Sequence, residues 1–141
     1  MCAEDVYNDF LPDTGIVSYI NLPEFDGVRN DSALYEGYEV SVHYDPMVAK
    51  LIVHADTRQE CIELTKQALD QYQIVGFKTT IPFCRQVLDS EPFVTGKYST
   101  FFVKDHWPLS IPSTFLSQVA SIAALGYTAE DERRQPLPSD V

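Results

Sequence analysis

Basic residues are scarce in this chain. It holds 10 lysines and arginines against 21 aspartates and glutamates in 141 residues, which gives a formal net charge of −11. The basic residues are also dispersed along the sequence, whereas binding to a phosphate backbone requires a clustered basic face. The charge balance therefore argues against nucleic acid, and against an anionic membrane surface, as a partner.

Cysteines and long apolar runs are lacking as well. The three cysteines, Cys2, Cys61 and Cys84, are odd in number and widely spaced, which fits neither a disulfide framework nor a zinc site. No apolar run approaches the length of about 20 residues that a membrane helix needs. Met1 is followed by acidic residues, unlike the basic start of a secretory signal. We expect one main domain in a soluble, cytoplasmic protein with reduced thiols.

Alternation of apolar and polar residues predicts several strands. They are expected at residues 15–20, from residue 27, at 39–44, at 47–55 and at 74–78. The clearest alternation is at 39–44, where Val40, Val42 and Tyr44 would share one face. A helix predicted between the strands at 47–55 and 74–78 gives a strand-helix-strand unit, and hence a mixed α and β domain.

Helix signals are concentrated in the second half of the chain. Thr57 and Glu60 have the spacing of a capping box and predict a helix over residues 57–72. One stripe of that helix is expected to be buried: Cys61, Ile62, Thr65, Ala68, Leu69 and Tyr72. A short helix is predicted at 81–88. Beyond the main domain at 1–108, we expect an extra helix at 109–127 and a mobile polar tail at 128–141.

Histidine clusters give no support for a metal site. His43, His54 and His106 are too far apart in sequence to be recognised as ligands, so no metal is predicted. His43, Tyr44 and Asp45 could suggest acid–base chemistry. Adjacent strand residues point to opposite faces, however, so a structural role is favoured for this trio.

Arg29 is the first lysine or arginine of the chain, and it follows six acidic residues. Its guanidinium offers a rigid fork of donors that suits a carboxylate, bicarbonate or phosphate, and Gly27 lets the backbone approach closely. The alternative is a simple surface pair with Asp26 or Asp31. The isolated residues favour this alternative, because most arginines are solvated or weakly paired.

A series of short blocks occurs in a defined order along the first part of the chain. The blocks are Ala3-Glu4-Asp5, Phe10-Leu11-Pro12-Asp13-Thr14-Gly15, Gly27-Val28-Arg29-Asn30-Asp31-Ser32, His43-Tyr44-Asp45-Pro46-Met47-Val48-Ala49-Lys50-Leu51-Ile52, Gly76-Phe77-Lys78-Thr79-Thr80, and Phe93-Val94-Thr95-Gly96 leading to Thr100-Phe101-Phe102-Val103. Together they resemble the C-terminal domain of biotin carboxylase, as found in acetyl-CoA, propionyl-CoA, methylcrotonyl-CoA and pyruvate carboxylases. The resemblance covers roughly the first three-quarters of the chain. Two departures, Val6 in place of proline and Thr80 in place of the commoner asparagine, touch no expected substrate contact.

The resemblance implies an α+β fold with a mostly antiparallel sheet and packed helices. It also implies a part in ATP- and bicarbonate-dependent carboxylation of biotin, with Arg29 matching the family arginine that reaches toward bicarbonate and the biotin carbonyl oxygen. Asp45 and Lys50 would add polar contacts behind it, and the segment from His54 to Arg58 resembles a dimer interface. An ordinary exposed helix start explains that last segment equally well.

The resemblance further implies the cofactors and partners of a parent enzyme. These are biotin on a carrier domain or protein, ATP with magnesium or manganese, ATP-grasp lobes in the same subunit, a carboxyltransferase and a second copy of the subunit. The chain alone is expected to be inactive and to hold none of the cofactors. Two alternatives stay open: a non-catalytic acidic protein-interaction module of the same fold, and a small-ligand regulatory domain.

Overall fold

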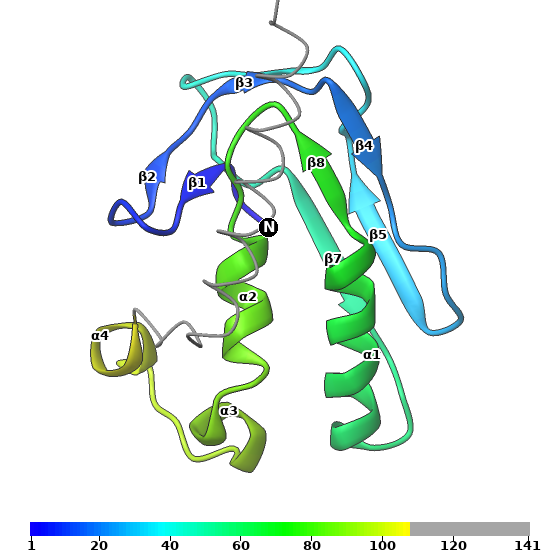
Figure 1. Ribbon diagram of the computed structural model, residues 1–141, viewed down its shortest axis with the longest axis vertical. Helices are drawn as coiled ribbons and strands as arrows, with labels where there is room; N and C mark the ends of the chain where they lie inside the picture. Colours follow the sequence, from blue (N-terminus) through cyan, green and yellow to red (C-terminus); the bar gives the residue numbers. More distant parts are fainter. Residues whose placement is uncertain (108–141) are drawn as a thin grey trace, which may run out of the picture. The chain divides into compact units, whose positions relative to one another are not determined.

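The computed structural model of the chain describes residues 1–107 (Figure 1). The helix expected at 109–127 and the tail expected at 128–141 lie outside the described residues. Within residues 1–107 the elements are β1 (Glu4–Asp5), β2 (Leu11–Pro12), β3 (Gly15–Ile16), β4 (Tyr19–Asn21), β5 (Val28–Ser32), β6 (Glu39–Val40), β7 (Ala49–Val53), α1 (Arg58–Gln71), β8 (Gln73–Val75), α2 (Ile81–Val87), α3 (Glu91–Thr95) and α4 (Phe102–His106). None of these helices is long and apolar enough to cross a membrane.

The strands pair as short antiparallel ladders. The pairs are β1–β2, β3–β6, β4–β8 and β5–β7, and each is a separate two-stranded sheet. The expected α+β class with antiparallel pairing is confirmed, although the strands form small sheets where one larger sheet was expected.

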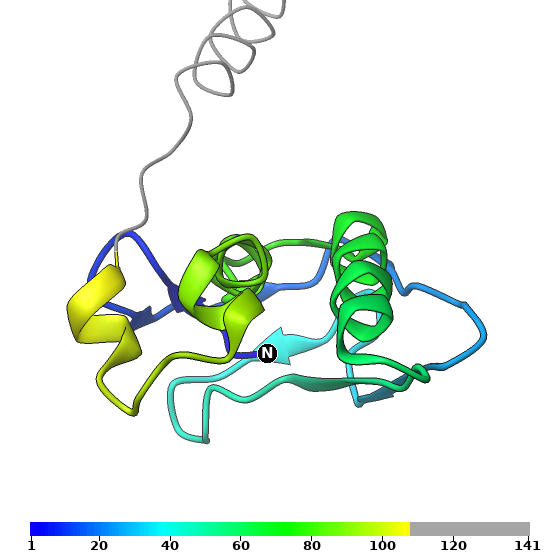
Figure 2. The same ribbon diagram turned by 90° about the horizontal axis from the view of Figure 1, so that it is seen from below.

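The β5–β7 ladder is the longest, and it carries Arg29. Its register joins Arg29 to Ile52 and Asp31 to Lys50. Helix α1 packs against β7 (Figure 2). Leu51 of β7 lies against the buried cluster of Ile62, Leu69 and Leu88. Because side chains alternate between the faces of a strand, Leu51 and Lys50 point to opposite sides. Arg29, Asp31 and Lys50 therefore occupy the face of the ladder away from α1.

Helix α1 begins where the sequence predicts. Thr57 caps it, since the Glu60 N–H donates to the Thr57 hydroxyl over 3.2 Å and the Thr57 N–H donates to the Glu60 carboxylate over 3.0 Å. Most of the predicted stripe is buried: Ile62, Ala68, Leu69 and Tyr72, with Cys61 and Thr65 half-buried. The helix at 81–88 is likewise confirmed, as α2.

The predicted strand at 39–44 is wrong beyond Val40. Strand β6 ends there, and the side chains expected on the buried face are open to solvent, with Val42 68% and Tyr44 84% exposed. The Ser41 hydroxyl accepts the N–H of the residue two positions later over 3.2 Å. Such local side-chain bonds offer the backbone an alternative to a ladder and bend the chain into a turn.

The predicted strand at 15–20 is divided in two. The Val17 N–H donates to the Tyr38 carbonyl over 2.9 Å, whereas the Ser18 N–H donates to the Val75 carbonyl over 2.8 Å. The chain thus leaves its partner β6 at Val17 and takes β8 as its partner from Ser18 onward. Alternation of residue types does not reveal such an exchange, because both halves keep an extended backbone.

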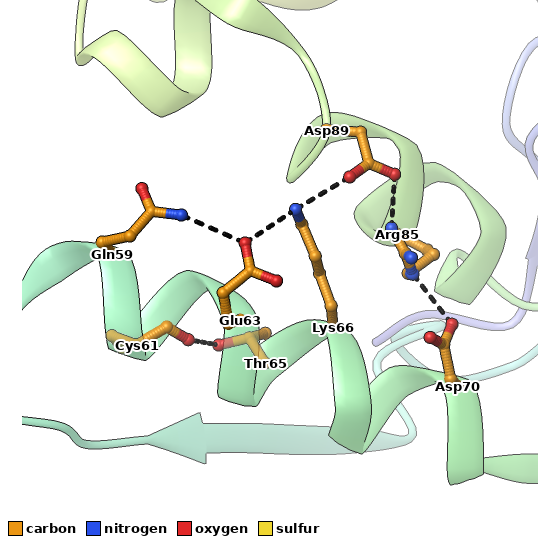
Figure 3. A network of polar contacts seen from close by, with 8 residues as sticks. All are labelled: Gln59, Cys61, Glu63, Thr65, Lys66, Asp70, Arg85 and Asp89. Atoms are coloured by element: carbon orange, nitrogen blue, oxygen red, sulfur yellow. Dashed lines mark hydrogen bonds and ion pairs between the residues drawn. The ribbon is translucent and has the colours of Figure 1, made fainter.

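An ion network connects α1 with the end of α2 (Figure 3). Lys66 of α1 contacts Asp89 over 2.8 Å and Glu63 over 3.1 Å, and its side chain is only 16% exposed. Arg85 of α2 contacts Asp70 of α1 over 2.8 Å and also pairs with Asp89. The two helices lie side by side (Figure 1), so the network fixes their separation.

Candidate functional site

Arg29 is displayed openly on the outer face of β5. Its side chain is 70% exposed, and it borders a hollow of about 580 Å³ lined mainly by the segment from Leu22 to Asp26. The strand alternation explains the exposure, because Val28 and Asn30 on either side of Arg29 turn inward and are half-buried. An exposed guanidinium beside a hollow can reach a ligand without any rearrangement of the backbone.

Asp31 holds one edge of the Arg29 guanidinium. The distance from Arg29 Nε to one Asp31 carboxylate oxygen is 3.1 Å, and that from Nη2 to the other is 3.3 Å. The sequence left Asp26 and Asp31 as alternatives for this pairing. Asp31 is the partner because residues two apart in a strand share a face, whereas Asp26 precedes the strand and lines the hollow.

The other edge of the Arg29 guanidinium is directed away from Asp31. A guanidinium has five N–H donors; Asp31 accepts one of the two on Nη2, and its other oxygen lies 3.1 Å from Nε in the ion pair. The remaining Nη2 hydrogen and the two on Nη1 donate no hydrogen bond to any residue within 1–107. Two parallel N–H groups at this edge match the oxygen spacing of a carboxylate or bicarbonate.

Gly27 lets the backbone just before Arg29 approach the end of β7 closely. Its φ of +79° favours glycine, and a Cβ at this position would lie 2.5 Å from the His54 carbonyl oxygen. The His54 N–H donates to the Gly27 carbonyl over 2.8 Å. The close approach expected at Gly27 is therefore made to the backbone of His54, and it sets where β5 begins.

Of the two predicted supporting residues, the structure places only Lys50 beside Arg29. Lys50 lies directly opposite Asp31 and on the same face of the ladder. Asp45 lies in the turn before β7, where its carboxylate accepts the N–H of Met47 over 2.8 Å. Within the described residues Asp45 makes no hydrogen bond to Arg29 or Lys50.

The two residues predicted at a dimer interface are both exposed, but they differ in their contacts. His54 follows β7 and is exposed. Arg58 donates from Nη2 to the Phe93 carbonyl over 2.6 Å and stacks over the Phe93 ring, 5.0 Å from its centroid. Arg58 thus ties the start of α1 to α3, and its part in a dimer stays a prediction.

Asn30 is a residue of the site that the sequence did not single out. Its side-chain amide donates to the Pro23 carbonyl over 3.0 Å and holds the segment that lines the hollow. Alternation in β5 predicts that it points inward, but no sequence signal predicts its bond to Pro23. Among residues 1–107, no group of three or more His, Cys, Asp or Glu side chains is arranged to hold a metal ion.

Known proteins resemble this chain over nearly all of its described part. The family model of the biotin carboxylase C-terminal domain matches residues 1–105. A biotin carboxylase from Halalkalibacterium halodurans is 48% identical over 104 residues, which are 74% of this chain and 23% of that protein. The mitochondrial propionyl-CoA carboxylase alpha chain of Caenorhabditis elegans is 38% identical over 117 residues, covering 82% of this chain and 16% of that protein.

Solved structures agree with the sequence matches. The biotin carboxylase domain dimer of Hydrogenobacter thermophilus 2-oxoglutarate carboxylase, in complex with MgADP, ADP and bicarbonate, matches with a TM-score of 0.73 at 34% identity. The match covers 74% of this chain and 23% of that one. The biotin carboxylase subunit of a pyruvate carboxylase also matches with a TM-score of 0.73, at 37% identity over 74% of this chain. The chain spans about a quarter or less of the length of these relatives. It belongs to the family of biotin carboxylase C-terminal domains.

Proposed function

We propose that this domain contributes Arg29 to the active site of an ATP- and bicarbonate-dependent biotin carboxylase. Membership of the family supports the reaction class. The observation that carries the role of Arg29 is its exposed guanidinium, of which Asp31 holds one edge while the opposite edge stays open beside a hollow. The position matches the block Gly27-Val28-Arg29 by which the family arginine is recognised.

The chemistry suits a guanidinium that is held in place before the substrate arrives. Biotin, when bound, supplies the carbonyl oxygen on which negative charge develops, and bicarbonate is itself an anion. Two parallel N–H donors from Arg29 would stabilise either charge. A donor aimed at developing charge lowers the barrier more than it strengthens ground-state binding.

The wider assembly forms part of the same proposal. ATP with magnesium or manganese would be held by ATP-grasp lobes of the same subunit, and biotin would arrive on a carrier domain before a carboxyltransferase uses it. The H. thermophilus relative is described as a dimer in complex with MgADP and bicarbonate. A homodimer contact through His54 and Arg58 is proposed by the same analogy.

The test is substitution of Arg29 in the complete carboxylase. Arg29→Ala should lower bicarbonate-dependent carboxylation of biotin by about a hundredfold or more, as loss of a preorganised charge-stabilising donor does. Lys97→Ala is a matched control, because Lys97 is an exposed cation far along the chain from β5. Intact activity in Arg29→Ala would remove the catalytic role and leave a non-catalytic acidic interaction module as the better account.

A further inference from the structure

Asp31 is the partner of the Arg29 guanidinium in the described residues. The Arg29 Nη2 donates a hydrogen bond to one Asp31 carboxylate oxygen over 3.3 Å, and Nε lies 3.1 Å from the other in an ion pair. Two contacts on one edge restrict rotation of the guanidinium more than one contact would. Within residues 1–107, Asp31 is also the only residue that forms a hydrogen bond or ion pair with the Arg29 side chain.

We propose that Asp31 is a positioning residue, which holds the inner edge of Arg29 so that its Nη1 and Nη2 atoms face an incoming anion. The inference rests on the proposed function of Arg29. Arginine has several rotatable bonds, and at 70% exposure packing restrains them little. If Asp31 has already ordered the side chain, the ordering entropy is not lost again when the anion binds.

Lys50 explains how a carboxylate can lie so near an anion site. It stands opposite Asp31 in the ladder, on the same face as Arg29, and makes no ion pair within 4.0 Å among the described residues. Two cations therefore flank one carboxylate on this face of the ladder, and Lys50 offsets the charge of Asp31 beside Arg29. Glu24 and Asp26 add acidic side chains at the hollow itself.

A competing role for Asp31 would have the opposite consequence. If its carboxylate merely occupied the place of the anion, removing it would free Arg29 and improve use of bicarbonate. If Asp31 positions Arg29, removing it should impair the reaction. The sign of the effect on turnover therefore separates the two.

The first experiment follows the Arg29 guanidinium by ¹⁵N NMR in this chain. Asp31→Ala should convert the Arg29 Nε–H and Nη–H signals from those of a restrained group to those of a freely rotating one. Asp26→Ala is the matched control, since Asp26 borders the same hollow without bonding to Arg29. Unchanged Arg29 signals in Asp31→Ala would overturn the inference.

The second experiment measures kinetics in the complete carboxylase. Asp31→Ala should lower kcat on the order of tenfold and leave KM for ATP unchanged, because a loosely held donor is misaligned at the reacting centre only. Asp31→Asn, which keeps the size of the side chain, should show the same loss, and Asp31→Glu should recover part of it. Unfolding temperatures equal to that of the parent enzyme would show that the variants fold.

The outcomes separate this inference from the proposed function. Unchanged or faster turnover in Asp31→Ala, with Arg29→Ala strongly impaired, overturns the positioning role and leaves the role of Arg29 intact. Wild-type turnover in both variants overturns both. Loss of turnover in Asp31→Ala together with a raised KM for ATP would indicate a general structural defect, which also contradicts the inference.

Discussion

For single side chains, the geometry of Arg29 matters as much as its charge. Asp31 holds the Nε edge, and the second edge offers two parallel donors. A lysine keeps the charge but has one ammonium group, which cannot bond Asp31 and an anion through opposite edges of a plane. We expect Arg29→Lys to lower biotin carboxylation by about tenfold or more. Steady-state kinetics of the complete carboxylase would measure this, and activity near that of the parent would show that charge alone suffices.

Gly27 offers a test of how the ladder places Arg29. Gly27→Ala should lower the free energy of unfolding by about 2 kcal/mol or more, since it combines an unfavourable φ with a backbone clash. The added Cβ would lie 2.5 Å from the His54 carbonyl oxygen. Urea unfolding of the chain would measure the loss.

Gly37 supplies the matched control for that experiment. Its φ is also positive, at +92°, but a Cβ there meets nothing within 4 Å. Gly37→Ala should therefore cost only the backbone strain, about 1 kcal/mol. Equal losses at the two positions would show that the close approach of Gly27 to His54 is unimportant.

Among the secondary-structure elements, we expect the stability of α1 to depend on its N-terminal cap. Thr57→Ala removes the hydroxyl that accepts the Glu60 N–H and should cost about 1 kcal/mol of unfolding free energy. Thr57→Ser keeps a hydroxyl at the same place and should stay close to the parent. Thermal unfolding followed by circular dichroism would compare the three proteins, and an equal loss in both variants would mean that the cap does not stabilise the helix.

The ion network between α1 and α2 predicts how stability depends on pH. Burial raises the pKa of Asp89, but hydrogen bonds from Lys66 and Arg85 outweigh it and leave that pKa below its ordinary value of 3.8. A lowered carboxylate pKa stabilises the fold above the ordinary value, and this stabilisation is lost as pH falls through the folded-state pKa. The unfolding free energy should therefore decline below about pH 4.

Asp89→Asn tests this link directly. The variant should be less stable than the parent at pH 7, by roughly 1 kcal/mol as for partly exposed pairs, and should lose less stability between pH 5 and about pH 2. Urea unfolding across that range gives both quantities. The Asp5 carboxylate should leave some pH dependence in the variant, because its hydrogen bond with Lys78 also lowers its pKa. An identical pH profile in the two proteins would exclude Asp89 as a contributor.

For the molecule as a whole, we expect biotin carboxylation only when this domain is part of the complete carboxylase. The matched relatives are about four times longer than this domain or more. The nucleotide site is proposed to lie in the rest of such an enzyme. The isolated chain should show no bicarbonate-dependent hydrolysis of ATP, and the complete enzyme should. A coupled phosphate-release assay would measure both, and such hydrolysis by the chain alone would contradict the proposal.

Local features of the fold were predictable from the sequence. Three of them are confirmed: the cap at Thr57, the buried stripe of α1 and helix α2. Each depends on residues only a few positions apart. The strand at 39–44 failed for a reason that is also local, because hydroxyl and carboxylate side chains compete with a ladder for backbone N–H groups.

The sequence by itself determined the family, the antiparallel α+β class and the choice of Arg29 as the candidate residue. Only the tertiary structure decided that residues 28–32 form a strand paired with β7, in which Asp31 rather than Asp26 holds Arg29, that Lys50 stands opposite Asp31, and that Arg58 reaches Phe93. The physical reason is register. Contacts between neighbours in sequence follow from the local backbone, whereas contacts across β5 and β7 or between α1 and α3 depend on how distant segments align when the core packs.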